Sequence, residues 1–475
     1  MRIQRARQTG QRCGNSKRDE LIPRDIDAHG FRCDAVVPDG HDRTARAGID
    51  EVQNDEERDE NKYKAQPEGG ASRHAGDALC TVDDHIACLV QVQRKRVLQR
   101  NMEAGRISAD IEGIEQVFDD LTKGQRYDGK IVAAQAQDRA DRQELTDPDS
   151  FTMILLGDPQ GYTKYDINQP LFDLCTAWIA DNVDHLNIKA VLCTGDLVEQ
   201  NENIVLNRKM LNQTSREMWE AASHALARLD GKVPYIVSPG NHDYGYRKAE
   251  NSRTCFPDYF PFERNPAWRD VCVATYPNRN GDISLENAAF AFDDPAWGGL
   301  LVVTTEFLPR DEVLDWAAAL IDKPEYRDRK VIFMTHAFLH ERSAKRIEKN
   351  SYELTPGNTG AEIWRKLIEP SPNIRMVVCG HTGKPGDYED AVAYRVDKNR
   401  AGHDVHQMMF NVQILGGGWE GNGGDGWIRI LEFLPDGRTV RVMTYSPLFA
   451  LSPTTRQHAW LTEEGNQFTF EFRQR

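Results

Sequence analysis

The chain has 475 residues, of which 28% are charged, and a formal net charge of −15. This length is enough for two or three domains, and the negative charge excludes a basic surface that would collect nucleic-acid phosphates. No uncharged apolar run approaches the roughly 20 residues that cross a membrane, so we expect neither a nucleic-acid partner nor a membrane span.

The first 150 residues differ in composition from the rest of the chain. Charged residues occupy 54 of these 150 positions but only 79 of the 325 positions in residues 151–475. All nine Trp lie at or after Trp178. Residues 1–98 show no helical or strand period, which is typical of a chain that cannot bury a core. We expect a largely disordered, low-complexity extension over residues 1–150, with one amphipathic helix over residues 101–121, where apolar residues recur at helical spacing.

An alternative interpretation is that residues 1–150 follow from a start assigned too far upstream. Their excess of Asp, Gln, Glu and His fits translation opposite another gene, because codons for apolar residues then become codons for these polar residues. The intact mass of the natively produced protein distinguishes the two interpretations. Because the basic start Met1–Arg7 is not followed by the apolar segment of a signal peptide, the default expectation is a cytoplasmic protein.

From Phe151 onward, short apolar runs alternate with amphipathic segments. We expect strands at Thr152–Leu156, Ala190–Cys193, Pro234–Val237, Gly299–Thr304, Lys330–Met334 and Ile374–Val378, and helices at Pro170–Val183, Ser215–Leu229, Asp311–Ile321 and Ala361–Ile368. This alternation predicts an α/β layered domain over residues 151–450, followed by a C-terminal tail over residues 451–475.

Two stretches depart from this rhythm. Residues 244–300 form an aromatic-rich insertion, whose rings either grip a substrate at the crevice wall or simply pack a loop-rich segment. The glycine-rich stretch Gly416–Gly426 is either a mobile rim over a site or a long hairpin turn, and it lacks the residue order of a P-loop. The nine cysteines show no C-x-x-C spacing, which argues against a zinc knuckle or a full disulfide framework and leaves a Cys255–Cys272 pair open.

Five predicted strands are followed directly by residues that can bind metals or move protons. They are Asp158-Pro159-Gln160, Gly195-Asp196, Gly240-Asn241-His242-Asp243, Thr335-His336 and Gly380-His381. Open α/β sheets bind ligands outside the carboxyl ends of their strands, so we expect these segments to meet in one site. Carboxylate, amide oxygen and imidazole without thiolate favour Mn, Fe, Zn or Ni as the bound metal.

In this order the motifs resemble those of the calcineurin-like metallophosphoesterase superfamily: D-x-H, G-D-x-x-D, G-N-H-D/E, a lone H, and G-H-x-H. The resemblance covers roughly Phe151–Thr382, and the segments His406–Gln413 and Gly424–Pro447 are similar to the C-terminal strands of the variants with D-x-Q in the first motif. It implies a two-sheet β-sandwich flanked by helices, with a two-metal site at the strand ends. Relatives of this D-x-Q type are often exported, which leaves the location of this protein open.

The resemblance also implies a role for each matching residue. Asp196 would bridge two divalent metal ions, Asn241, His336 and His381 would complete one of them, and Asp158 would bind the other. His242 would stand beside the substrate as general acid, and Glu199 would orient it. The substrate would be a phosphate ester, attacked by a hydroxide held between the two ions.

Two departures from the family pattern affect the same metal ion. Gln160 stands where the first motif usually has His, and Gly383 stands where the second His of G-H-x-H would be. Gln160 still offers an amide oxygen as a ligand, and His406, on an expected strand, is a candidate replacement imidazole.

A second class of function stays open because of these replacements. The chain would then be a degenerate member that binds metal or phosphate without turnover, although a catalytic His kept beside its ligands favours an enzyme. The metal chemistry would also suit a nuclease, but the net negative charge of the chain does not favour binding to nucleic acid. The residues leave the natural substrate, monoester against diester, metal identity and oligomeric state open.

Overall fold

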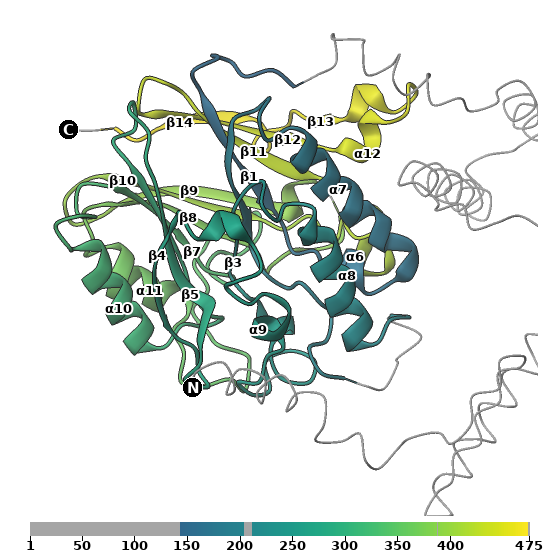
Figure 1. The fold of residues 1–475 in the computed structure, drawn as a ribbon, viewed down its shortest axis with the longest axis horizontal. Helices are drawn as coiled ribbons and strands as arrows, with labels where there is room; N and C mark the ends of the chain where they lie inside the picture. The colour runs from purple at the N-terminus through teal and green to yellow at the C-terminus, as the bar shows by residue number, and fades with distance from the viewer. Residues whose placement is uncertain (1–142, 204–210, 387, 474–475) are drawn as a thin grey trace, which may run out of the picture. The chain divides into compact units, whose positions relative to one another are not determined.

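The computed structural model describes residues 143–203, 211–386 and 388–473. The predicted helix over residues 101–121 and nearly all of the predicted extension lie outside these ranges. Within the described chain, two mixed β-sheets of seven strands each pack face to face, with helices on their outer sides (Figure 1). No helix among the described residues is long and apolar enough to cross a membrane.

The first sheet has the strand order β13-β12-β11-β1-β2-β3, with β14 also paired to β12. Its strands are β1 Phe151–Leu156, β2 Ile188–Cys193, β3 Tyr235–Val237, β11 Ile428–Phe433, β12 Thr439–Tyr445, β13 Trp460–Leu461 and β14 Phe468–Glu471. Strands β1, β2 and β3 run parallel, so their carboxyl ends lie at one edge.

The second sheet has the strand order β4-β5-β6-β7-β8-β10-β9. Its strands are β4 Cys272–Pro277, β5 Ile283–Phe292, β6 Leu300–Thr304, β7 Lys330–Met334, β8 Ile374–Cys379, β9 Val392–Lys398 and β10 Asp404–Phe410. The neighbours β6, β7 and β8 are parallel, which brings the ends of β7 and β8 to one edge as well.

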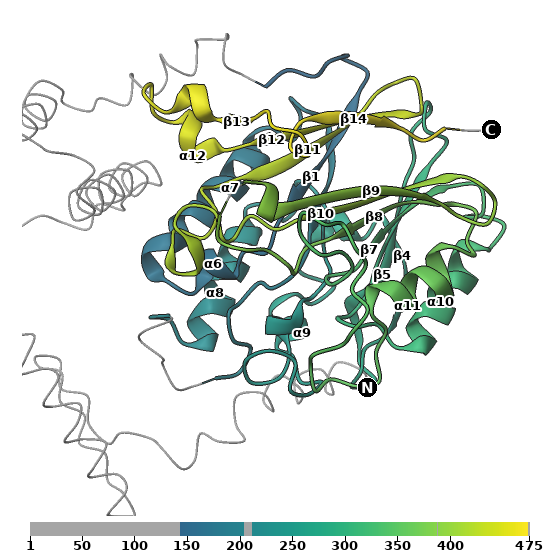
Figure 2. The same ribbon diagram turned by 180° about the vertical axis from the view of Figure 1, so that it is seen from behind.

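Helices cover the outer face of each sheet, as the two opposite views show (Figure 2). The α-helices are α6 Gln160–Thr163, α7 Gln169–Asp181, α8 Ser215–Ala227, α9 Phe256–Tyr259, α10 Asp311–Ile321, α11 Gly360–Ile363 and α12 Pro447–Ala450, and a π-helical turn η5 Trp364–Ile368 extends α11. Short 3-10 helices lie at η2 Asp166–Asn168, η3 Asn241–Asp243, η4 Pro266–Trp268, η6 Tyr388–Ala391, η7 Gly418–Glu420 and η8 Arg456–His458.

Alternation along the strands divides the apolar core into layers. Val302 and Met334 join the large cluster shared with the first sheet, whereas the adjacent Val303 and Phe333 join a separate cluster with residues of α10, α11 and η5. Successive strand residues point to opposite faces, and both faces here are covered. This arrangement confirms the predicted two-sheet fold flanked by helices.

One expectation from the sequence needs correction, and two points that the sequence left open can now be described. The segment 451–475 is not a separate tail, because β13 and β14 pair with β12 in the first sheet. The insertion 244–300 supplies β4 and β5 at one edge of the second sheet, and its aromatic residues Tyr244, Trp268 and Trp297 are buried in packing. Cys255 and Cys272 are both free, so they form no disulfide.

Candidate functional site

The strand ends of both sheets converge as predicted. Asp158 follows β1, Asp196 follows β2, Asn241 follows β3, His336 follows β7 and His381 follows β8. The ligand atoms of Asp196, His336 and His381 all lie within 4.8 Å of one another, a grouping suited to a metal ion. Four of these five side chains are at most 2% exposed, with His381 partly exposed, so water does not screen their charges strongly.

The imidazole of His336 lies at the centre of this group. Its Nδ1 is 2.6 Å from the carbonyl of Thr194, which accepts the Nδ1 proton. Its Nε2 lies 3.2 Å from the Asn241 side-chain oxygen and 3.2 Å from Asp196 Oδ2, and His381 Nδ1 is 3.1 Å away. Because Nδ1 is committed to the main chain, Nε2 is the atom available to a metal.

Two hydrogen bonds hold the Asp158 carboxylate in place. Its Oδ1 accepts a hydrogen bond of 2.7 Å from Thr194 Oγ1, and its Oδ2 accepts one of 2.8 Å from the main-chain N–H of His381. These contacts tie the first motif to the last one. Thr194 therefore supports both Asp158 and His336, a role that sequence reasoning missed, although the residue stands just after β2.

Gln160 points into the same group. Its Nε2 donates to Asp196 Oδ2 over 3.3 Å, while its Oε1 is buried without any hydrogen-bond partner. A buried amide oxygen without a partner is costly, unless a ligand completes it. This orphaned oxygen beside Asp158, Asp196, Asn241 and the two imidazoles fits a divalent cation, since carboxylate, amide and imidazole donors are the ligands such ions take.

His242 lies beside the group rather than within it. Its main-chain N–H donates to Asp196 Oδ1 over 2.8 Å, and its ring Nδ1 lies 2.7 Å from the main-chain carbonyl of Glu199. The Glu199 carboxylate instead pairs with Lys164 Nζ at 3.3 Å. The predicted contact between Glu199 and His242 is therefore present, but it uses the carbonyl oxygen of Glu199 and not its side chain.

His406 does not reach the site, and its prediction as a replacement ligand is wrong. It lies within β10 opposite Met376 of β8, three residues before that strand ends at Cys379. Tyr394 Oη is 2.7 Å from its Nδ1, and the carbonyl of Glu471 is 3.0 Å from its Nε2. With both ring nitrogens engaged and its ring stacked on Phe470, His406 has no atom left for a metal.

The charges of the metal-free site perturb one another. Burial, which alone would raise the pKa of Asp196, is outweighed by His336 and His242, so this pKa lies well below its ordinary value. Burial raises the pKa of Asp158 to about 7, against the opposing effect of His336. Burial would lower the pKa of His336, but Asp196 and Asp158 raise it to about 9. A protonated His336 thus balances the two carboxylates, and a metal has to displace that proton.

Two of the site residues adopt left-handed backbone conformations. Asp196 has a φ of 51° and His381 a φ of 76°, values that residues other than glycine rarely adopt. Such strain persists where the surroundings enforce it, and it is concentrated at functional sites. Here Asp243 supplies part of that enforcement, since its carboxylate accepts hydrogen bonds from the N–H groups of Leu197 and Gly240.

Gly380 leaves no room for a side chain beside the site. A Cβ at this position would lie 2.1 Å from Asp158 Oδ1 and 2.6 Å from Thr194 Oγ1. We expect Gly380→Ala to displace Asp158 and to weaken metal affinity by about 10- to 100-fold, the usual effect of disturbing the support of a metal ligand. Calorimetric titration with Mn²⁺ measures this, and Gly231→Ala, where a Cβ would meet nothing within 4 Å, is the control; its φ of 73° makes a small loss of stability the only expected effect.

A cavity of about 300 Å³ opens directly onto the group. Gln160, Asp196, Asn241, His242 and His381 form part of its lining, so a molecule in the cavity would meet both the metal-binding atoms and the His242 ring. Of the two predicted catalytic residues, His242 lines the cavity and Glu199 does not, and the predicted ligands Asp158 and His336 lie outside the lining.

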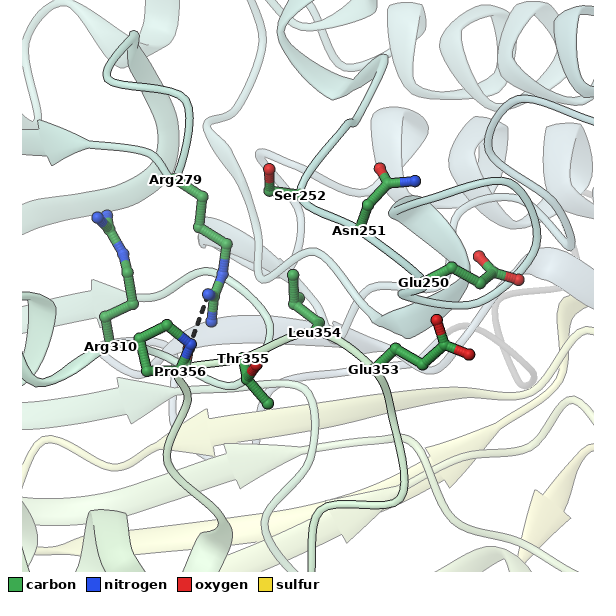
Figure 3. Close-up of a pocket in the computed structure, with 9 residues that line it drawn as sticks. All are labelled: Glu250, Asn251, Ser252, Arg279, Arg310, Glu353, Leu354, Thr355 and Pro356. Carbon is green, nitrogen blue, oxygen red and sulfur yellow. Dashed lines mark hydrogen bonds between the residues drawn. The ribbon is translucent and has the colours of Figure 1, made fainter.

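A second cavity, of about 330 Å³, lies against the loop that follows Tyr352 (Figure 3). Its two arginines are already engaged, because Arg279 donates to the carbonyl of Pro356 over 2.7 Å and Arg310 pairs with the buried Glu306 at 2.8 Å. Glu353 lies on the side of the cavity away from these arginines (Figure 3). This cavity holds none of the strand-end residues, so the chemistry belongs to the first one.

Comparison with known proteins agrees with this geometry. Residues 151–385 match the family model of the calcineurin-like phosphoesterases. They form a calcineurin-like phosphoesterase domain. The match ends just after His381, so it contains all of the converging strand ends described above.

The chain is also similar to several individual proteins. The uncharacterized protein YvnB of Bacillus subtilis (strain 168) is 30% identical over 311 residues, which are 63% of this chain and 20% of YvnB. The chain therefore spans about a fifth of the length of that relative's sequence. Among solved structures, a dimetal phosphatase from Danio rerio is 10% identical with a TM-score of 0.38, covering 68% of this chain and 99% of its own. GAP50, an inner-membrane-complex anchor of Plasmodium, is 11% identical with a TM-score of 0.36, over 68% of this chain and 88% of its own.

Proposed function

We propose that this protein hydrolyses a phosphate ester with the help of two divalent metal ions. The observation that carries the proposal is the meeting of Asp158, Asp196, Asn241, His336 and His381 beside a cavity that His242 also lines. Asp196 is the shared ligand in this proposal. Asn241, His336 and His381 would complete the ligands of one ion, and Asp158 with Gln160 would hold the other.

A pair of divalent cations about 3.5 to 4 Å apart lowers the pKa of water and polarises the phosphoryl group for in-line displacement. The residues of the chain would hold the cations in position. The Thr194 carbonyl fixes the tautomer of His336, and the Asp158 carboxylate is aimed by Thr194 and the His381 main chain. Because these supports are buried, they need little reorganisation during the reaction.

His242 is the proposed general acid for the leaving oxygen. Burial lowers its pKa, but Asp196 and Glu199 outweigh this effect, and the pKa lies above its ordinary value. The raised pKa favours the protonated ring that a general acid requires. Since Nδ1 faces the Glu199 carbonyl, Nε2 is the nitrogen left to deliver that proton.

The competing proposal is a degenerate site that binds metal or phosphate without turnover. The retention of Asn241, His242 and His381 in one group beside the cavity favours hydrolysis, because a binding module does not need the general acid. The two proposals differ in one assay: the turnover of p-nitrophenyl phosphate and bis(p-nitrophenyl) phosphate by the full chain, loaded with Mn²⁺ or stripped by a chelator.

We expect turnover of at least one ester by the loaded protein and loss of that turnover after metal removal. Restoration by added Mn²⁺ excludes damage by the chelator. Metal retention without turnover of either ester would support the binding module instead. Turnover that is unaffected by complete metal removal would contradict both proposals.

A further inference from the structure

Apart from His242, the described residues that line the first cavity include no side chain that can carry a positive charge outside the metal-binding group. Among the described residues that line this cavity, none is Lys or Arg, and the rim residue Glu341 contributes a carboxylate. The Glu341 side chain is 10% exposed, and its Oε1 pairs with Lys384 Nζ at 2.9 Å. Lys384 itself lies outside the lining, with its side chain 73% exposed.

This charge distribution distinguishes two kinds of phosphate ester. A monoester has a second pKa of about 6 and carries close to two negative charges at neutral pH, whereas a diester carries one. Arg and Lys are frequent donors to highly charged phosphoryl groups, alongside metal ions. The described lining offers only neutral donors and His242 beyond the metal-binding group, and the Glu341 carboxylate, although paired with the exposed Lys384, places negative charge at the cavity.

Aromatic side chains on the rim offer a place for a second organic group. Tyr352 lines the cavity with its ring centroid 5.8 Å from that of His381 and 5.2 Å from that of Phe307. Trp419 also lines the cavity, and it is 46% exposed. An exposed indole next to a polar cavity presents a flat apolar face that a ligand can cover.

The position of Trp419 is linked to the metal-binding group. It lies in η7, whose main chain closes by a 2.9 Å hydrogen bond from Gly421 N–H to the Gly418 carbonyl. Asn168 donates to the Gly421 carbonyl over 2.8 Å and to the Gly161 carbonyl over 3.0 Å. Gly161 directly follows Gln160, so the glycine-rich segment is anchored to the same short helix that carries a proposed metal ligand.

We propose that the preferred substrate is a phosphodiester whose retained organic arm lies against Tyr352 and Trp419. This inference rests on the proposed hydrolysis of a phosphate ester and names the class of that ester. A water oxygen forms the new bond to phosphorus while the bond to one alcohol breaks; this alcohol leaves with a proton from His242, and the proton released by the water replaces it. The ions that the metal-binding residues would hold supply positive charge for the single negative charge of the diester. The product is a monoester, and the added charge that it gains beside Glu341 favours its release.

The test compares Glu341→Gln and Trp419→Ala with the loaded full-length protein on bis(p-nitrophenyl) phosphate and p-nitrophenyl phosphate. We expect the wild type to have a higher kcat/KM for the diester than for the monoester. Glu341→Gln should raise kcat/KM for the monoester several-fold and leave the diester within about twofold, because only the dianion is strongly repelled. Trp419→Ala should lower kcat/KM for the diester about 3- to 10-fold, the range expected for loss of an aromatic contact, and should spare the monoester.

Two matched controls separate these effects from general perturbation. Glu353→Gln makes the same charge change at an exposed residue of the second cavity (Figure 3), and Phe262→Ala removes an aromatic ring that is 40% exposed outside the lining. Neither should alter the ratio of the two kcat/KM values. A wild-type preference for the monoester, or equal changes for both esters in Glu341→Gln and Trp419→Ala, would overturn the proposal.

A binding measurement keeps this inference separate from the proposed function. Calorimetric titration with diphenyl phosphate and phenyl phosphate compares a diester and a monoester without any need for turnover. We expect tighter binding of diphenyl phosphate, weakened by Trp419→Ala, even if hydrolysis fails. Equal or tighter binding of phenyl phosphate would reject the diester assignment, whereas absence of turnover with this binding pattern would reject only the hydrolysis.

Discussion

Replacing Asp196 by Asn should remove almost all activity and at least one of the two proposed metal ions. One of its oxygens, Oδ1, accepts the His242 N–H at 2.8 Å, and the other, Oδ2, lies 3.2 Å from His336 Nε2. The substitution keeps the shape but removes the negative charge and one acceptor oxygen. Removing a residue that only supports a metal ligand lowers metal affinity or activity by about 10- to 100-fold. Loss of the shared ligand itself should therefore lower kcat/KM by more than about 100-fold.

The choice of Asn limits side effects on the backbone. Position 196 has a φ of 51°, and Asn tolerates this left-handed conformation at least as well as Asp. Asp311→Asn is the matched control, because its carboxylate is 65% exposed and pairs with Lys366 on the surface. Elemental analysis and ester turnover are measured on both variants. Full metal content with retained activity in Asp196→Asn would show that Asp196 does not bridge the ions.

The second large effect is expected for His242→Ala. A positioned general acid contributes about 10²- to 10⁴-fold, and the hydrogen bond from His242 to the metal-binding group comes from its main-chain N–H, which the substitution keeps. We therefore expect kcat to fall by that factor while the metal content stays at the wild-type level. The decline of kcat toward high pH, which reports loss of the proton from the acid, should disappear in the variant.

Another histidine provides the control for this substitution. His224 lies in the last turn of α8 with its side chain 68% exposed, so His224→Ala should leave kcat and its pH profile unchanged. Loss of metal in His242→Ala would make His242 a ligand rather than an acid. An unchanged kcat with full metal content would remove it from the mechanism.

Much of the site was predictable because a simple rule controls it. A polar residue that follows a buried parallel strand must emerge at the carboxyl edge of the sheet, and Asp158, Asp196 and His336 all obey this rule. Motif spacing alone did not show which atoms meet. The Glu199 contact passes through a carbonyl oxygen, which depends on the path of the chain and not on the identity of the side chain.

The incorrect expectation for His406 has a similar physical origin. Its segment was predicted to be a strand and it is one, but the register places His406 opposite Met376, before the end of β8. Register depends on pairing between distant segments, which composition does not reveal. A candidate ligand that lies two or three residues before the end of a strand stays within the sheet and does not reach a site at the carboxyl edge.

Strands β4 and β5 were missed for a different reason. Strand β5 carries Glu286 and Asn287 at buried positions, which breaks the alternation that marks a strand in sequence. These polar residues are tolerated because Asn278 donates to Glu286 over 2.7 Å and Asn287 donates to Glu306 over 3.0 Å. These partners lie only 8 and 19 residues away in the chain, but the sequence alone does not show that their side chains meet.

The most direct test of the two-metal account is anomalous X-ray diffraction from crystals of the Mn²⁺-loaded protein. The account predicts two anomalous peaks about 3.5 to 4 Å apart, both within ligand distance of Asp196, with Asn241, His336 and His381 around one and Asp158 and Gln160 around the other. Absence of metal peaks between these residues, or a single peak that Asp196 does not contact, would contradict it.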